Sequence, residues 1–313
     1  MLRIYTNGNE NFFERPKVKS IATFFQKMVL SKDATVSFSD CPGKAKYLLG
    51  LIHRLKDEYP DDVIVCSPDY SENHDNCGRF ATYLRSLLWF NEKYYTDYAT
   101  DTIESEEFAK DTQWYIKRTR NYSFAAKGGN NDEPHNHNDI GSFIFLKNGK
   151  QIICDLGAGI YTRQYFDPKT RYEIFECSSR SHSVPIINGK YQKAGKDRCA
   201  VNVEDSKGML SMDISGAYDI PELSRLQRTF CCDDNGVTVT DSISYNGEGK
   251  VTERLITLTE PKVTENKILL DDAQIEFYGA NNVSVSTEDT NDSKVYIIDL
   301  EAEACGEFKL KIK

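Results

Sequence analysis

Histidine is scarce in this chain and gathers in one region. Of the five histidines, three (His135, His137 and His182) lie near one another in the sequence, with Asp155 between them in an apolar run. Imidazole nitrogens and carboxylate oxygens are ligands that zinc prefers, and three protein ligands leave a fourth position for water. Two imidazoles and one carboxylate from this region therefore predict a site for one divalent metal, zinc before other ions.

The elements that must position these residues are read from the apolar pattern that follows them. An apolar run at 140–146, an Asn-Gly turn at 147–150 and a second run at 151–157 predict a β-hairpin. If the histidine pair lies on a strand, His135 and His137 point to the same face, because alternate residues share a face. Asp155 would then return beside His137, and His182 would come from a separate strand.

The rest of the chain divides into a helical part and a strand-rich part. Apolar spacing predicts helices over 17–30, 44–59 and 79–91, followed by an acidic polar stretch at 98–111. Beyond it the apolar period changes to two, and short strands alternate with turns rich in Asn, Asp and Gly, which indicates an antiparallel β-sandwich. We therefore predict an α+β fold, with a helical region over 1–111 and a sandwich over 112–313.

Four sequence blocks carry a family resemblance. They are GGNNDEPHNHNDIGSF (128–143), CDLGAGIYTRQYF (154–166), RYEIFE (171–176) and SHSVPIINGKYQ (181–192). In order and spacing they resemble the C-terminal domain of the heparinase II/III-like polysaccharide lyases. The resemblance implies a metal-bearing β-sandwich packed on an α/α toroid, with the active cleft between them. Because little of the chain is available for helices, its helical region would be a remnant of that toroid.

The resemblance also implies roles for single residues. His137, Asp155 and His182 match the metal ligands, His135 matches a histidine of the catalytic cleft, and Tyr172 matches a catalytic tyrosine of some alginate-type members. Further substrate contacts are expected from residues near these in the sequence: Glu133, Asn136 and the basic residues Arg171 and Arg180. The implied reaction is β-elimination at a uronic acid. In it His135 would assist proton transfer or neutralise the carboxylate, and Tyr172 would protonate the departing oxygen.

Composition limits the partners and the compartment. The net charge is −9 and no basic stripe emerges, which argues against nucleic acid as a partner, while a locally basic cleft could still take an acidic polysaccharide or oligosaccharide. No run reaches transmembrane length and the first residues lack the apolar core of a signal peptide, so we expect no membrane and a cytoplasmic location. The nine cysteines form no Cys-x-x-Cys pair and fit free thiols in a reducing compartment. The sequence leaves open whether the chain forms a homo-oligomer.

Two other classes of protein are alternatives to a lyase. A cupin-type metal enzyme also uses His-x-His, but a Glu ligand and a Gly-rich turn follow that pair within a few residues, whereas here the next acids are Asp139 and Asp155. A non-catalytic, metal-stabilised carbohydrate-binding protein is the stronger rival. Activity against acidic polysaccharides would separate the lyase from the binding protein.

Overall fold

The structure is a computed structural model that describes residues 8, 10–72, 79–98, 104–290 and 293–313. His74, expected to be structural or solvent-exposed, lies outside these residues. The chain divides into two compact units, the first made of residues 1–35 and 44–102 and the second of residues 36–43 and 103–313. The second unit is therefore discontinuous in sequence, with Val36–Gly43 as its first piece.

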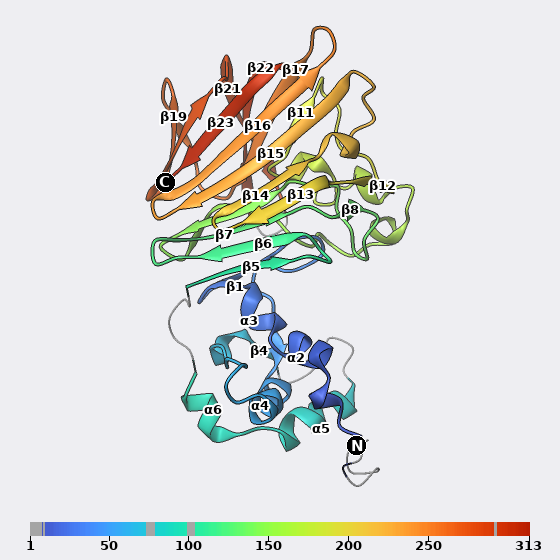
Figure 1. Cartoon of the computed structure of the whole chain (residues 1–313), viewed down its shortest axis with the longest axis vertical. Helices are drawn as coiled ribbons and strands as arrows, with labels where there is room; N and C mark the ends of the chain where they lie inside the picture. Colours follow the sequence, from blue (N-terminus) through green and yellow to red (C-terminus); the bar gives the residue numbers. More distant parts are fainter. Residues whose placement is uncertain (1–7, 9, 73–78, 99–103, 291–292) are drawn as a thin grey trace. The chain divides into compact units, whose positions relative to one another are not determined.

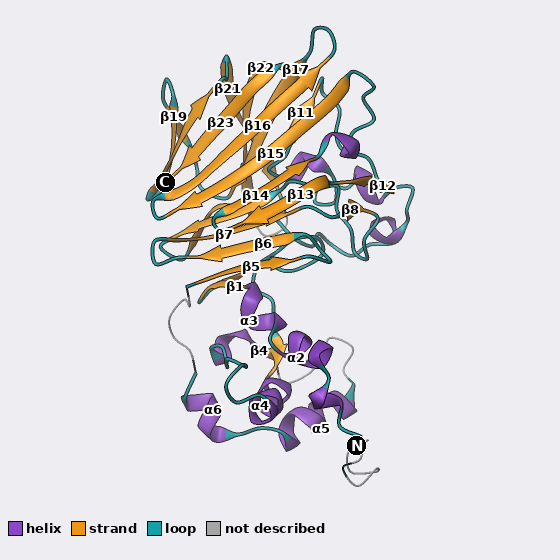
Figure 2. Cartoon of the chain, in the orientation of Figure 1, coloured by secondary structure: helices purple, strands orange, loops and turns teal. Residues whose placement is uncertain are grey.

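The first unit is mainly helical (Figure 2). Its helices are η1 (Phe12–Glu14), α2 (Pro16–Ala22), α3 (Phe24–Met28), α4 (Leu49–Glu58), η2 (Pro68–Tyr70), α5 (Phe80–Leu88) and α6 (Glu92–Thr96). Two small sheets accompany them, β1 (Val29–Ser31) with β2 (Ala34–Thr35), and β3 (Tyr47–Leu48) with β4 (Ser71–Glu72). Buried aromatic and aliphatic side chains form a core of their own, including Tyr47, Ile52, Tyr59, Val65 and Tyr70.

The helices are shorter than their apolar patterns predict. The segment 17–30 forms two helices, which meet at Thr23, and its end pairs as β1. The segment 44–59 is helical only from Leu49, because Tyr47–Leu48 pairs in parallel with Ser71–Glu72. In both places a strand pairing replaces a helical turn, and such tertiary pairing overrides helix propensity.

The second unit consists of antiparallel sheets (Figure 1). The five-stranded sheet has the order β10-β9-β7-β6-β5, the four-stranded sheet β11-β17-β22-β21, and the eight-stranded sheet β13-β14-β15-β16-β23-β20-β19-β18. Strands of the first sheet are β5 (Ser105–Ala109), β6 (Trp114–Arg118), β7 (Tyr122–Lys127), β9 (Phe143–Lys147) and β10 (Lys150–Ile153). Those of the second are β11 (Pro185–Ile187), β17 (Lys250–Thr257), β21 (Asn282–Asp289) and β22 (Lys294–Glu303).

The eight-stranded sheet contains β15, the longest strand of the described residues. Its strands are β13 (Val201–Ser206), β14 (Met209–Asp213), β15 (Leu223–Asp233), β16 (Gly236–Tyr245), β18 (Lys262–Val263), β19 (Lys267–Leu270), β20 (Ala273–Tyr278) and β23 (Gly306–Ile312). A fourth, two-stranded sheet joins β8 (Asn130–Asn131) to β12 (Gly195–Cys199), and short turns η3 (Gln164–Phe166), η4 (Arg171–Glu173), η5 (Ser179–Ser181) and η6 (Ser215–Ala217) lie between strands. The predicted antiparallel β-sandwich is confirmed.

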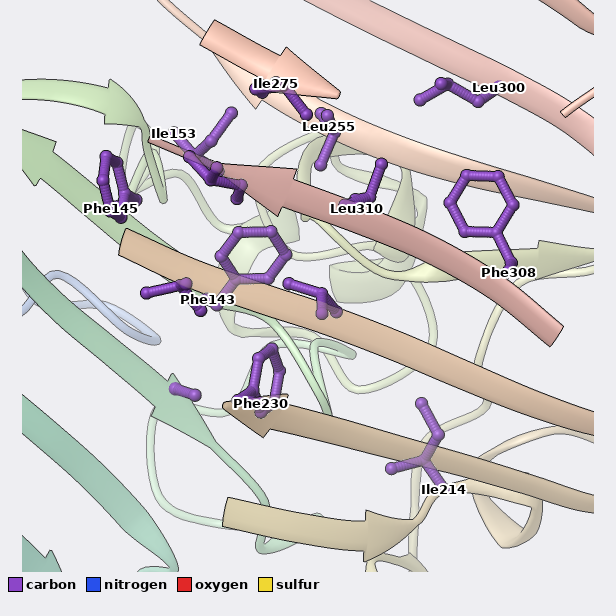
Figure 3. Packing of buried hydrophobic residues seen from close by; sticks show 14 of the residues in the cluster. Phe143, Phe145, Ile153, Ile214, Phe230, Leu255, Ile275, Leu300, Phe308 and Leu310 are labelled. Carbon is purple, nitrogen blue, oxygen red and sulfur yellow. The ribbon is translucent and has the colours of Figure 1, made fainter. Parts of the chain in front are cut away.

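One hydrophobic core joins the three large sheets. Phe143 of β9 and Phe230 of β15 meet with ring centroids 5.6 Å apart, and Leu255 and Leu300 add the four-stranded sheet to the same cluster (Figure 3). Alternating strand residues supply these side chains, as a sandwich requires. The core fixes the strand ends from which the loops of the candidate site leave.

The predicted hairpin is β9 with β10, closed at Asn148 and Gly149, both with positive φ (50° and 77°) as a type I′ turn needs. Two segments counted with the helical region in the sequence analysis, Val36–Gly43 and β5, lie in the second unit. Strand β5 has no apolar alternation of its own and pairs with β6 at the edge of its sheet.

Candidate functional site

The candidate site is formed by four segments of the second unit that lie outside its strands. These segments are 36–43, the turn 132–139 between β8 and β9, the stretch 154–166 after β10, and the turns 171–182 before β11. Each long segment starts or ends at a strand of the common core. The site residues are therefore loop residues on a rigid support.

The histidine pair does not lie on a strand, and this prediction was wrong. Asn136 N–H bonds to Glu133 O at 3.1 Å and closes a turn, and Pro134 within it has no N–H for strand pairing. His135 takes a positive φ of 61°, a conformation that costs about 1 kcal/mol or more for a non-glycine residue. The two side chains separate: that of His137 is fully buried, and that of His135 is 62% exposed.

His137, Asp155 and His182 come together as predicted. Their candidate ligand atoms all lie within 4.8 Å of one another, and all three residues are buried. His182 Nδ1 lies 2.9 Å from Asp155 Oδ2, and His182 Nε2 lies 3.0 Å from the carbonyl oxygen of Glu176. The Nδ1 atom of His137 is buried and has no hydrogen-bond partner among the described residues. These three side chains could hold a metal ion.

Burial and charge perturb all three groups. Burial lowers the pKa of His137. Burial alone would also lower the pKa of His182, but the Asp155 carboxylate outweighs it and the pKa of His182 is raised. For Asp155, burial acts to raise the pKa, and the neighbouring His182 and His137 lower it below the ordinary value. Asp155 is therefore a carboxylate at neutral pH, as a metal ligand must be.

A buried arginine in the core supports the loops that carry these ligands. Arg228 of β15 donates from Nη1 to Gly141 O at 2.9 Å and to Ser183 O at 3.0 Å. Its other nitrogens bind Asp241, at 2.8 and 2.6 Å, and Glu253. Arg228 thereby ties the segment next to His182 to the sheet.

The sequence analysis missed Asp40. Its carboxylate lies 2.9 Å from His137 Nε2 through Oδ1 and 2.8 Å from His135 Nδ1 through Oδ2. The hydroxyl of Tyr165 and the Nη2 atom of Arg171 also donate to Oδ1. Burial acts to raise the pKa of Asp40, but the hydrogen bonds from His137, Tyr165 and His135 hold it well below the ordinary value. Asp40 is a buried anion that contacts both histidines of the pair.

Two hollows open on either side of His135. One, of about 470 Å³, is the Tyr172 hollow, lined by Asp132, Glu133, His135, Asn136, Phe166, Pro168, Arg171, Tyr172, Ala194 and Gly195. The other, of about 630 Å³, includes Asp40, Trp114, Glu133, His135 and Tyr161 in its lining. His135 and Glu133 belong to both. In the first hollow, the Nδ2 atom of Asn136 donates to the Tyr172 hydroxyl at 3.3 Å.

The expected substrate contacts take different positions. Glu133 and Asn136 line the Tyr172 hollow, and so does Arg171. Arg171 is nevertheless engaged within the protein, since it donates to Asn136 O, Tyr165 O and Asp40. Arg180 is in neither hollow; it donates to Ser178 Oγ and Glu173 O. The structure thus brings together every predicted site residue except Arg180.

The described residues of the second unit thus form a β-sandwich with an exposed histidine, His135, beside a buried His-Asp-His cluster. The profile of the family "Heparinase II/III-like, C-terminal" matches residues 104–304. The chain belongs to this family, and the resemblance found in its sequence blocks is confirmed.

Solved structures agree on the fold. The chain is similar to a heparinase III described as the BT4657 gene product, with a TM-score of 0.62 and 13% identity over 92% of this chain and 45% of that one. It is similar to the heparan sulfate lyase HepC from Pedobacter heparinus, with a TM-score of 0.55 and 15% identity over 95% of this chain and 54% of that one. A structure titled heparinase III gives a TM-score of 0.56 and 15% identity over 94% of this chain and 47% of that one. The chain thus spans about half the length of these proteins.

No curated protein matches the chain. Within the described residues, the helices are too short or too polar to cross a lipid bilayer.

Proposed function

We propose that this chain is part of a polysaccharide lyase that cleaves uronic-acid-containing polysaccharide or oligosaccharide by β-elimination. The observation that carries the proposal is the position of His135. Its side chain is exposed at the wall shared by two hollows, and it stands beside a buried cluster of metal-binding type. Family membership and the similarity to named lyases support it.

We also propose one divalent metal, zinc before other ions, on His137, Asp155 and His182. The donor chemistry supports it. Because Glu176 O only accepts hydrogen bonds, the Nε2 atom of His182 carries a hydrogen. The Nδ1 atom then faces the Asp155 oxygen at 2.9 Å, so a proton or a cation must lie between these two acceptors. His137 Nδ1 lacks a partner among the described residues, and a buried polar atom left so costs about 1–3 kcal/mol.

When bound, such a metal would join the three loops and add positive charge near the histidine pair. The chemistry falls to the residues around the Tyr172 hollow. In β-elimination a base takes the proton from the carbon beside the carboxylate. The electron pair of the broken carbon–hydrogen bond then forms a carbon–carbon double bond. The bond to the glycosidic oxygen breaks, and that oxygen takes a proton from an acid.

His135 is suited to the proton transfer or to neutralising the substrate carboxylate. Among its hydrogen bonds to described residues, that to Asp40 occupies Nδ1, which leaves Nε2 for the substrate. Tyr172 is placed to act as the acid, because its hydroxyl lines the same hollow as His135 and is protonated at neutral pH; burial raises its pKa further above the ordinary value. Both residues line one hollow of about 470 Å³, a volume in the usual range of ligand pockets.

The charges that line the Tyr172 hollow limit which residues can neutralise the substrate carboxylate. Asp132 and Glu133 line it together with Arg171, whose guanidinium is paired with Asp40. The hollow therefore offers no spare arginine among the described residues. His135, the hydroxyl of Tyr172 and the amide of Asn136, which also donates to that hydroxyl, are lining groups that can face the carboxylate.

A metal-stabilised carbohydrate-binding protein without catalysis is the second candidate. It is favoured by the lining of the Tyr172 hollow, where Asp132 and Glu133 stand beside an arginine, Arg171, that is already paired with Asp40. The two candidates differ in product, since only the lyase creates an unsaturated uronate.

The test measures product and binding together. The chain, supplied with the helical toroid region of a family lyase, is incubated with heparan sulfate, alginate and a neutral glucan, and the unsaturated uronate is followed by its ultraviolet absorbance. We expect turnover on an acidic polymer, lost in His135→Ala, with metal content retained. Lys169→Ala, a change at an exposed residue outside both hollows, is the control. Binding without product when the helical region is present would favour the second candidate.

A further inference from the structure

We propose that Asp40 is a positioning residue that sets opposite ring tautomers on the two histidines of the pair. This rests on the proposed metal site and assigns a role to a residue 95 positions from His135 in the sequence. Through one oxygen Asp40 holds His137 with Nδ1 toward the ligand cluster. Through the other it holds His135 with Nε2 free at the hollow.

The Asp40 carboxylate determines which ring nitrogens of the two histidines carry hydrogen. An ionised carboxylate accepts hydrogen bonds and donates none, and two oxygens of Asp40 each lie against one ring nitrogen. Oδ1 lies 2.9 Å from His137 Nε2, and Oδ2 lies 2.8 Å from His135 Nδ1. Both nitrogens must therefore carry hydrogen. In the neutral rings the remaining lone pairs are then on His137 Nδ1 and His135 Nε2.

The lone pair on His137 is the one that a metal needs. His137 Nδ1 is buried and unpartnered within the described residues, in the cluster with Asp155 and His182. Metal-binding histidines commonly donate their other N–H to a carboxylate or a backbone carbonyl. Asp40 would be that carboxylate for His137, and Glu176 O would be that carbonyl for His182.

Asp40 could instead be a ligand, because Asp40, His137 and Cys177 form a second group of suitable atoms. The guanidinium of Arg171 argues against this reading. Its Nη2 lies 2.8 Å from Oδ1, the oxygen that also meets His137, and the Tyr165 hydroxyl donates to the same atom. A cation placed there would face a fixed positive charge at short range. Asp40 is thus placed to orient its neighbours.

The segment around Asp40 is held independently of the histidines. Ser37 Oγ donates to Asp155 O at 2.9 Å, and Phe38 packs edge-on against Trp114 with centroids 5.4 Å apart. Gly157 has φ +66°, and a β-carbon on it would lie 2.1 Å from Cys41 O. Such close backbone approach is possible only with glycine. The position of Asp40 is therefore held by contacts of its neighbours in the segment that involve neither histidine.

The test uses Asp40→Asn, which keeps size and shape. Asparagine offers one accepting oxygen and one donating NH₂ group, so it cannot accept from both rings. We expect zinc affinity, measured by chelator competition, to fall about 10- to 100-fold. Asp132→Asn removes the same charge from a residue of the Tyr172 hollow and should leave zinc affinity unchanged. Equal zinc affinity in Asp40→Asn and the unaltered chain would overturn the role toward His137.

The tautomers can also be read in the unaltered chain, without any variant. Nitrogen-15 NMR of histidine-labelled protein, with and without zinc, should give hydrogen on Nε2 of His137 and on Nδ1 of His135, and zinc should shift Nδ1 of His137. The opposite tautomer on either ring would overturn the inference. Neither readout needs substrate, so absence of lyase turnover would count against the proposed reaction and leave this result standing. A chain that binds no zinc would refute the metal proposal and the role toward His137.

Discussion

Replacing Arg228 by methionine tests how much the buried arginine contributes. Methionine matches the unbranched stem of arginine, lacks its guanidinium group and carries no charge, so Arg228→Met leaves Asp241 and Glu253 in the core without the arginine. It also removes the donors to Gly141 O and Ser183 O, on the two loops that lead to the candidate metal ligands.

The magnitude follows from the bonds that are lost. Arg228 makes five hydrogen bonds to described residues and its side chain is fully buried. Removing one partner of a buried ion pair costs about 3–5 kcal/mol, and each buried carbonyl left unsatisfied costs about 1–3 kcal/mol. A loss of at least about 5 kcal/mol is expected. Because a domain is stable by about 5–15 kcal/mol, the variant should be partly unfolded or close to it.

The assay must report the second unit alone. The chain has two tryptophans, Trp89 after α5 in the first unit and Trp114 on β6 in the second. In a Trp89→Phe background, urea unfolding followed by fluorescence reports Trp114. With a slope of about 1–3 kcal/mol per molar urea, the midpoint should fall by about 2 M or more.

The matched control removes the arginine together with both acidic side chains. Arg228→Met/Asp241→Leu/Glu253→Met should recover most of the loss, because apolar replacement of a whole buried ionic group is often neutral or stabilising. If Arg228→Met alone unfolds within about 1 kcal/mol of the parent protein, the network is not a stabilising tie and this reasoning fails.

Three further predictions follow from the same structure. Burial raises the pKa of Glu253 well above 4.5 despite the charge of Arg228. The stability contributed by the protonated form of Glu253 is therefore fully present below pH 4.5, and it is lost as the pH rises through the raised pKa of the folded protein. Urea unfolding should therefore show the parent protein losing stability toward alkaline pH relative to Glu253→Gln, and parallel curves would contradict it. His137→Ala should lose about one equivalent of zinc and melt at a lower temperature, whereas His135→Ala should keep both, as metal analysis and calorimetry can check; full metal in His137→Ala would remove it from the ligand set. Gly157→Ala should displace Val36–Gly43 and change Trp114 fluorescence, while Gly189→Ala, with a similar φ of +70° and no atom within 4 Å of the new β-carbon, should not; equal effects would mean that backbone strain alone is responsible.

The sequence predicted the strands of the second unit better than the conformation of its site. The run 236–245 is β16 as expected, because alternating apolar residues over ten positions specify a half-buried strand. The histidine pair was placed on a strand by the same periodicity, yet Asp132-Glu-Pro-His135 has the composition of a turn, and the chain turns there. A spacing of two residues between the histidines is too short to distinguish a strand from a turn.

Asp40 could not be linked to the site from a single sequence, because its partners are 95 to 131 positions away. The available signal was the alternation Val36-Ser-Phe-Ser39 before Pro42-Gly43, a strand-like pattern within a helical third of the chain. Arg228 had a clearer signal. It lies on the same strand face as Leu226 and Phe230, so a charge at a core position already indicated a buried partner.

The discontinuity of the second unit matters for anyone who dissects this protein. A fragment begun at residue 104, where the family match starts, would contain strands β5 to β23 and lack Val36–Gly43. It could fold as a sandwich and still have a disordered histidine turn, so an inactive fragment would be misjudged as an inactive domain. The missing piece is a short peptide with its own anchors, Ser37, Phe38 and Asp40. Added in trans, that peptide would turn the fragment into a two-part system in which assembly of the site can be titrated.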